Sequence, residues 1–231
     1  MSSNLAYHGP TGDYFADNAA TGTWNAYIDR PAMLDLIGNV DGQQILDAGC
    51  GAGHHAASLV DRGASVLGLE GSAALVEHAR SRLDDRAEIR HCDLDEPLDT
   101  LADSSFDGVL CALVLHHLRS RTKFLSEVFR VLRPGGWFAI STTHPTSDWQ
   151  CFNDSYFSQE WVDLALRDGT HTIHYQRMTL EAILSEVLSA GFVLERLVEP
   201  RPAETLREVN PAAYNELLQH PSLLALRLRR P

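Results

Sequence analysis

The sequence of 231 residues contains no apolar run that approaches the ~20 residues needed to span a bilayer. Its first residues, MSSNLAYHGPTGDYF, lack the basic segment and the apolar core of a secretory signal. These two absences predict a protein that has no membrane span and stays in the cytoplasm. Internal repeats and low-complexity segments are also missing, so a single α/β domain with additions fits the length.

Positive charge is scarce. The chain has 19 Lys and Arg against 31 Asp and Glu, which gives a formal net charge of −12. Such a chain repels nucleic-acid phosphates, so no nucleic-acid partner is predicted. The one basic cluster, RLRRP at residues 227–231, lies on an alternating strand, where a solvated face is the expected explanation.

Metal-binding and redox patterns are absent as well. The four cysteines, at positions 50, 92, 111 and 151, form no CxxC and no zinc-like spacing. In a reducing compartment they are expected to be small core hydrophobes rather than disulfides. Neither the pair His116 and His117 nor the pair His171 and His174 has nearby carboxylates in a metal-binding pattern, so no metal is predicted.

What the sequence does contain is a regular alternation of strand-like and helix-like segments. Strands are expected at 43–49, 65–71, 87–93, 106–114, 137–143, 192–199 and 222–230, and helices from about 54, over 72–83, around 124–132 and within 178–192. This alternation predicts right-handed βαβ crossovers and a parallel sheet covered on both faces. The period of two in the last strand predicts a half-exposed antiparallel edge.

The stretch ILDAGCGAGHHAASL at 45–59 joins the first strand to the first helix through three glycines spaced two apart. A dinucleotide-binding turn, GxGxxG, would need a third glycine at position 54, where His54 stands. The pattern is instead an acidic GxGxG built from Asp47, Gly49, Gly51 and Gly53. Bare backbone lets a ligand lie against such a turn, and the carboxylate can bind a cation or hydrogen-bond donors. A tight turn without any ligand is the alternative.

Polar side chains follow the next strands at the edge where an open parallel sheet binds its ligands. Glu70 stands 17 residues after Gly53, the distance at which a carboxylate accepts both ribose hydroxyls of an adenosine. Asp93 ends the third strand and can accept from an exocyclic amine, and no Lys or Arg is aimed at a phosphate. A ligand that has an adenosine and an ammonium group but no phosphate is S-adenosylmethionine.

Five segments in this order resemble one family. These segments are LDAGCGAG, GLEGS, CDLDEPL, FDGVLCALVLHHL and EVFRVLRPGG. Over about residues 36–143 the chain resembles the class I S-adenosylmethionine-dependent methyltransferases, in particular the small-molecule branch that includes the ubiquinone and menaquinone C-methyltransferases. The resemblance implies an α/β, Rossmann-like seven-stranded sheet of order 3214576 with the last strand antiparallel, helices on both faces and a small cap. It also implies S-adenosyl-L-methionine as the cofactor and S-adenosyl-L-homocysteine as its product.

The resemblance assigns residues to this cofactor. Asp47 and Gly49 would flank the methionine moiety, Gly51 and Gly53 would complete the turn, Glu70 would bind the ribose, Asp93 the adenine amino group and Ala112 the methionyl end, while Gly71 and Leu94 are further cofactor-binding candidates. Tyr14 and Trp24 resemble the aromatic lid that many relatives fold over the donor, although ordinary helix-packing residues would have the same pattern.

The segment from His144 to Arg177 is rich in aromatic residues: Trp149, Phe152, Tyr156, Phe157, Trp161 and Tyr175. Such enrichment fits a cap over an apolar pocket, or else residues that bury the segment against the sheet. The first interpretation predicts a small, largely apolar or aromatic metabolite as the methyl acceptor. An oxygen or nitrogen acceptor could lose its proton to a histidine, and His116 and His144 are the catalytic candidates.

These expectations divide the single methyltransferase domain, residues 1–231, into an N-terminal lid (1–35), a donor-binding core (36–143), a cap insertion (144–177) and a C-terminal helix with strands (178–231). Two other functions fit parts of the pattern. One is a non-catalytic S-adenosylmethionine-binding module, because fold and site do not prove turnover. The other, a nicotinamide-dependent oxidoreductase, is disfavoured by the histidine at position 54.

Overall fold

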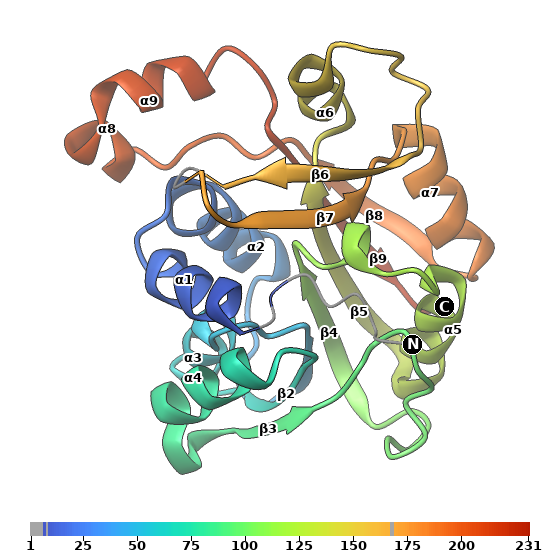
Figure 1. The fold of residues 1–231 in the computed structure, drawn as a ribbon. Helices are drawn as coiled ribbons and strands as arrows, with labels where there is room; N and C mark the ends of the chain where they lie inside the picture. Colours follow the sequence, from blue (N-terminus) through green and yellow to red (C-terminus); the bar gives the residue numbers. More distant parts are fainter. Residues whose placement is uncertain (1–6, 8, 167–168) are drawn as a thin grey trace.

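The computed structural model describes residues 7, 9–166 and 169–231 (Figure 1). Residues 1–6 and 8 of the predicted N-terminal lid, and residues 167–168 of the predicted cap, lie outside the described part of the chain. No helix within the described part is long and apolar enough to cross a membrane.

One mixed sheet of seven strands organises the molecule (Figure 1). In chain order its strands are β1 (Gln44–Ala48), β2 (Ser65–Glu70), β3 (Glu88–His91), β4 (Phe106–Ala112), β5 (Leu132–Thr143), β8 (Val193–Val198) and β9 (Leu223–Arg229). They lie in the order β3-β2-β1-β4-β5-β9-β8, and β9 pairs antiparallel with both β5 and β8. Numbered along the chain, this is the order 3214576 with the last strand antiparallel, so the prediction is confirmed.

Helices cover both faces of the sheet. Successive residues of a strand point to opposite faces, so neighbouring apolar residues pack against different helices. Ile45 packs in a cluster with residues of α2 (Arg30–Ile37), α3 (His54–Val60) and α4 (Ala73–Leu83). Its neighbour Leu46 packs in the other cluster, with residues of α5 (Arg121–Val131) and α7 (Leu180–Ser189). The α/β prediction with two covered faces is therefore confirmed.

Local signals in the sequence set several helix boundaries. The Ser72 hydroxyl accepts a hydrogen bond from the Leu75 N–H and caps α4, and the Thr179 hydroxyl caps α7 in the same way. Helix α5 ends at Val131, and β5 begins at the next residue. Strand β5 thus starts several residues before the expected position 137.

The strand β9 is not an edge strand, and the expectation that it lies at the edge is wrong. It lies between β5 and β8, so β8 forms the edge. The alternation arises because Arg227 and Arg229 share one face, where Glu195 of β8 pairs with both. Arg227 also donates to the carbonyl oxygens at the end of α2, which makes this arginine part of the helix–sheet packing.

Two segments flank the carboxyl ends of the central strands. The first comprises α1 (Pro10–Ala19) and the π-helical turn η1 (Asn25–Asp29), which runs into α2. The second comprises α6 (Pro145–Phe152) and a hairpin of β6 (Trp161–Ala165) with β7 (Thr172–Gln176). This hairpin, for which the sequence pattern gave no signal, extends across the molecule above β4 and β5 (Figure 1).

The remaining elements are short. They are η2 (Asp84–Arg86), η3 (Leu115–His117), α8 (Thr205–Val209) and α9 (Pro211–Leu217). The helix η3 follows β4 and carries His116 and His117. The pair α8 and α9 lies to one side of the sheet, before β9 (Figure 1).

Close packing in the sheet predicts a stability effect at Gly108. A Cβ atom at this position would lie 2.1 Å from the Trp137 ring on the neighbouring strand. Gly108→Ala should therefore lower the free energy of unfolding by about 1–3 kcal/mol, the usual cost of overpacking, measured by chemical denaturation. Adding Trp137→Leu, which vacates the space, should recover part of this loss. Additive effects of the two substitutions would contradict the packing explanation.

Candidate functional site

A cavity of about 630 Å³ lies where the carboxyl ends of β1, β2, β3, β4 and β5 meet the N-terminal segment and the hairpin. Most of the predicted site residues line this cavity: Gly49, Gly51, Glu70, Gly71, Asp93, Leu94, Ala112, Tyr14, Trp24 and His116. Asp47, Gly53 and His144 do not. The structure therefore brings most of the candidates together from four strand ends and from the N-terminal segment.

The glycine turn needs its glycines for two different reasons. Gly49 has φ +81°, and a Cβ atom there would lie 2.3 Å from a methyl group of Val114, in the loop after β4. The turn thus touches the neighbouring loop through bare backbone. Gly53 has φ +80° and packs against Leu83 and Ala79 of α4, so it sets the approach of two helices. Gly51 lines the cavity between them.

Glu70 at the end of β2 is held by backbone donors. One carboxyl oxygen accepts the Gly51 N–H at 2.9 Å, and the other accepts the Ser72 N–H at 2.8 Å. Burial raises the pKa of this carboxyl, and the hydrogen bonds oppose that effect. These donors do not use all four acceptor positions of the carboxylate, so the side chain can still bind a hydroxyl in the cavity.

The third and fourth strand ends complete the core side of the cavity. Asp93 accepts the Asp95 N–H at 3.0 Å, which fixes its carboxylate, and the buried Leu94 lies between them in the sequence. After β4, Leu113 has φ +58°, an unusual conformation for a residue with a branched side chain. Its N–H donates to the carbonyl oxygen of Ser141, which helps to hold the backbone next to Ala112 in this conformation.

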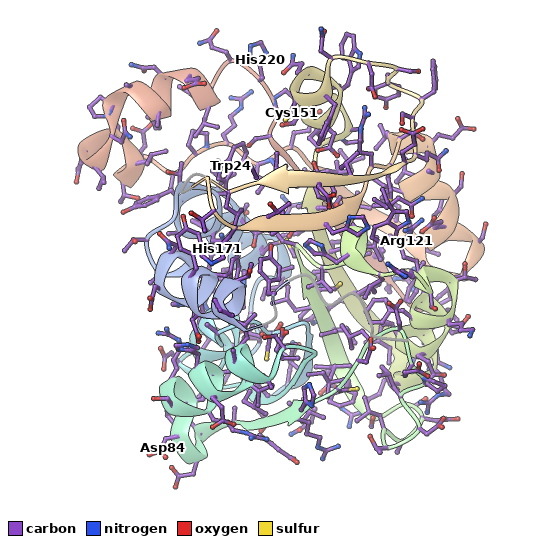
Figure 2. All side chains as sticks on the ribbon, in the orientation of Figure 1. Trp24, Asp84, Arg121, Cys151, His171 and His220 are labelled. Atoms are coloured by element: carbon purple, nitrogen blue, oxygen red, sulfur yellow. The ribbon has the colours of Figure 1, made fainter. Side chains whose placement is uncertain are left out.

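Aromatic residues of the N-terminal segment form a further wall. The predicted Tyr14 and Trp24 line the cavity, and so do Tyr7 and Phe15, which were not predicted. The Tyr14 ring stacks on His171 with centroids 4.9 Å apart, so α1 contacts the end of the hairpin (Figure 2). On its other side, Asp13 lies 3.1 Å from His78 of α4.

The two catalytic candidates have different environments. His116 lines the cavity, with Nδ1 2.9 Å from the Thr142 hydroxyl, and burial lowers its pKa well below the usual value. His144 does not line the cavity. Its Nδ1 accepts the Thr146 N–H and caps α6, while its Nε2 lies 3.2 Å from Glu199. His144 is therefore tied into the packing of the cap.

The cap contributes residues that sequence reasoning missed. Asp148 of α6 is 5% exposed and lines the cavity, and Tyr175 of β7 lies beside it. Trp149 and Trp161, by contrast, are not among the described lining residues. Trp149 is 44% exposed, and Trp161 stacks on His174, so neither ring contributes to the described wall. Tyr175 was selected only as part of the aromatic cap.

Buried acids lie outside the cavity wall near the glycine turn. Asp47 is 1% exposed, and burial together with Glu70 raises its pKa to about 7. Asp29 at the end of η1 is equally buried, and burial raises its pKa to about 7 as well. Its carboxyl lies 3.3 Å from Nε2 of His55, whose pKa burial lowers to about 3. Desolvation therefore favours the neutral form of both members of this pair.

The cavity wall is acidic. It includes the carboxyl groups of Glu70, Asp93, Asp95 and Asp148, and no Lys or Arg lines it among residues 7, 9–166 and 169–231. The same described residues hold no group of three or more side chains arranged to bind a metal ion. Such a wall favours a ligand with positive charge and hydrogen-bond donors over one with phosphates.

Comparison with known sequences identifies the central part of the chain. Residues 46–140 match the Methyltransf_11 family, a methyltransferase domain. A probable S-adenosylmethionine-dependent methyltransferase from Mycolicibacterium smegmatis is 45% identical over 44% of this chain and 38% of its own length. A demethylmenaquinone methyltransferase from Clavibacter sepedonicus is 36% identical over 55% of this chain and 52% of its own length. The chain thus spans about 40 to 50% of the length of these two relatives.

Comparison with solved structures supports the same fold over nearly the whole chain. An S-adenosylmethionine-dependent methyltransferase from Mesorhizobium loti superimposes with a TM-score of 0.71 and 24% identity, over 92% of this chain and all of the other. At this identity the likeness establishes the fold alone. The sequence matches, which cover the central part of the chain, agree with the predicted resemblance to S-adenosylmethionine-dependent methyltransferases.

The buried carboxyl of Asp29 predicts how stability depends on pH. The unfolded carboxyl loses its proton near pH 4 and the folded one near pH 7, so Asp29 destabilises the fold progressively as the pH rises between these values. Asp29→Asn, which has no proton to lose, should therefore gain stability relative to the natural chain by about 1–3 kcal/mol between pH 5 and pH 8. Denaturation at both pH values measures this difference.

Buried histidines such as His55 make stability rise with pH, which is the opposite trend. They are present in both chains, so the difference between the variant and the natural chain isolates the contribution of Asp29. Asp61→Asn is the matched control, since Asp61 is exposed and pairs with Arg86 at the surface. An equal loss of stability at both pH values would show that Asp29 is ionised in the folded protein.

Proposed function

Because this chain carries a methyltransferase domain and is homologous to S-adenosylmethionine-dependent methyltransferases, we propose that it transfers a methyl group from S-adenosylmethionine to a small, largely apolar or aromatic acceptor. The main support for S-adenosylmethionine as the donor is the acidic cavity wall, which has carboxylates and no Lys or Arg among its described residues. Such a wall suits a sulfonium and an ammonium group and disfavours the phosphates of a dinucleotide.

Different residues of the core bind different parts of the donor. The free acceptor positions of Glu70 bind the ribose hydroxyls, and Asp93 accepts from the adenine amino group. The bare backbone at Gly49 and the backbone at Ala112 border the methionine moiety. When bound, S-adenosylmethionine supplies a methyl group already activated by the sulfonium. The chain therefore has mainly to orient the acceptor for in-line displacement.

The cap side of the cavity supports the acceptor half of the proposal. Its wall includes Leu164, Leu166 and Ile173 of the hairpin region and Leu223 at the start of β9. A wall of this kind, in a cavity of about 630 Å³, suits a small apolar molecule rather than a protein or a nucleic acid. One relative is named a demethylmenaquinone methyltransferase, which agrees with a small-molecule acceptor.

His116 is the proposed general base for an oxygen or nitrogen acceptor that must lose a proton. Its ring is neutral at physiological pH, because burial lowers its pKa. In the tautomer whose Nδ1–H donates to the Thr142 hydroxyl, Nε2 has a free lone pair. The second candidate, His144, needs a rearrangement of the cap to reach the acceptor, since Thr146 and Glu199 hold its ring.

A non-catalytic S-adenosylmethionine-binding module is the alternative function. It shares every feature of the donor side and differs only in the absence of turnover. Donor binding without methylated product across a broad acceptor panel would favour the module. A nicotinamide-dependent oxidoreductase fits less well, because its cofactor would bring phosphates to the acidic wall.

Calorimetry tests the donor assignment. S-adenosylmethionine and S-adenosylhomocysteine should bind with micromolar Kd values, and NADH should not bind. Glu70→Ala should raise the Kd for S-adenosylhomocysteine roughly 10- to 150-fold, the equivalent of about 1.5–3 kcal/mol for hydrogen bonds to a charged group. Glu88→Gln is the control, because Glu88 is an exposed residue of β3 paired with Arg90. Tight NADH binding without any S-adenosylhomocysteine binding would contradict the proposed donor.

Two histidine variants test the base. His116→Ala should lower kcat by about 100-fold or more, the lower range for loss of a general base, while its Kd for S-adenosylhomocysteine stays unchanged. His144→Ala should lower kcat less than His116→Ala does. Full activity of His116→Ala across the pH range would mean that positioning alone drives the reaction. A carbon or neutral amine acceptor would then become the better assignment.

A further inference from the structure

The cap side of the cavity is apolar except for a small group of polar side chains near Asp148. This carboxylate comes from α6, one turn into the helix, and it is 5% exposed while lining the cavity. Its nearest partners are two neutral hydroxyls. Tyr175 donates to one carboxyl oxygen and Thr143 to the other, each at 2.9 Å.

These two hydrogen bonds fix the orientation of the carboxylate and leave part of its capacity free. Each oxygen of an ionised carboxyl can accept two hydrogen bonds, and each has one here. No Lys, Arg or His among the described residues forms an ion pair with Asp148. The Arg177 guanidinium acts on the pKa of Asp148 through its charge, but it is engaged by both oxygens of Asp154 at 2.7 Å. A buried carboxylate in this state gains from any donor that enters the cavity.

The position of Asp148 connects it with the proposed base. The Tyr175 ring that donates to Asp148 also contacts the ring of His116, with centroids 5.4 Å apart. A molecule bound to Asp148 in the cavity therefore lies close to His116. The surrounding wall of leucine and isoleucine side chains suits an apolar body with one polar end.

We propose that Asp148 determines the acceptor specificity by accepting a hydrogen bond from a hydroxyl or amino group on an otherwise apolar acceptor. This inference deepens the proposed methyl transfer and rests on it. It makes Asp148 a specificity-determining residue and predicts that a molecule of the same shape without the O–H or N–H group binds poorly. Hydroxyl and amine are distinguished by the experiment below.

Cys151 provides a direct readout of occupancy, independent of turnover. It lies three residues after Asp148 on α6, is exposed, and lines the same cavity (Figure 2). Cys50 and Cys111 are buried and Cys92 is partly buried, and peptide mass spectrometry follows alkylation of Cys151 by iodoacetamide separately from these three. A molecule that occupies the cap side should slow this alkylation, and the concentration dependence gives its Kd.

The experiment compares matched probes at concentrations up to 10 mM, with and without S-adenosylhomocysteine. 4-Ethylphenol is paired with 4-ethyltoluene, and phenethylamine is paired with propylbenzene, so each pair differs mainly in the donor group. In the natural chain, 4-ethylphenol or phenethylamine should bind at least tenfold more tightly than its hydrocarbon partner. The tighter of the two identifies the acceptor as a hydroxyl or an amine.

The variant Asp148→Asn should remove this preference by weakening the donor probe about tenfold or more, while the hydrocarbon Kd stays unchanged. Asp163→Asn is the matched control, because Asp163 is an exposed hairpin residue outside the described cavity wall. Tyr175→Phe, which keeps the carboxylate, should retain the preference for the donor probe. A purely structural role of Asp148 predicts instead that all probes are weakened together.

Equal protection by the donor probes and their hydrocarbon partners in the natural chain would overturn the proposal, as would failure of both donor probes to protect Cys151. An unchanged preference in Asp148→Asn would overturn it as well. The comparison within the natural chain remains decisive even if Asp148→Asn does not fold. Calorimetry with S-adenosylhomocysteine on the same protein separates the two proposals. Loss of donor binding would count against methyl transfer, whereas the probe preference tests Asp148.

Discussion

The paired hydrogen bonds of the Glu70 carboxylate are the constraint on which the donor side of the cavity depends. They join the glycine turn after β1 to the start of α4, because one oxygen accepts from Gly51 and the other from Ser72. The turn in turn touches the loop after β4 through Gly49 and Val114. Contacts therefore run across three neighbouring strand ends, at the place where the sheet order reverses between β1 and β4.

Most of the sheet could be predicted from the sequence because its strands are buried on both faces and separated by helices with clear apolar stripes. Which strand lies at the edge of the sheet could not be predicted in the same way. The alternation of β9 looks like an exposed face, yet Arg227 uses its charge to bind carbonyl oxygens at the end of α2. The alternation of residue types along a strand cannot by itself distinguish an arginine that faces water from one that faces a helix end. The difference depends on which element packs against that face of the strand.

The donor side was also more predictable than the cap. Glu70 and the glycines follow strands directly, so their position at the sheet edge follows from the strand boundaries. Asp148 is the one acid of α6, in a segment without a motif, and it reaches the cavity only because α6 and β7 fold over the sheet. The environment of His144 could not be predicted for the same reason. Adjacent to the end of β5, its ring serves as a helix cap instead of facing the cavity.

The place of β9 between β5 and β8 has a consequence for the order in which the protein folds during synthesis. Strands β1 to β5 can pair with one another as soon as each is made, but β8 has no partner in the sheet until the later β9 has been inserted. Until then, β5 presents an unpaired row of backbone N–H and C=O groups, the kind of edge that invites pairing with another chain. Residues 223–229 thus cover the open edge of β5 and at the same time connect β8 to the sheet.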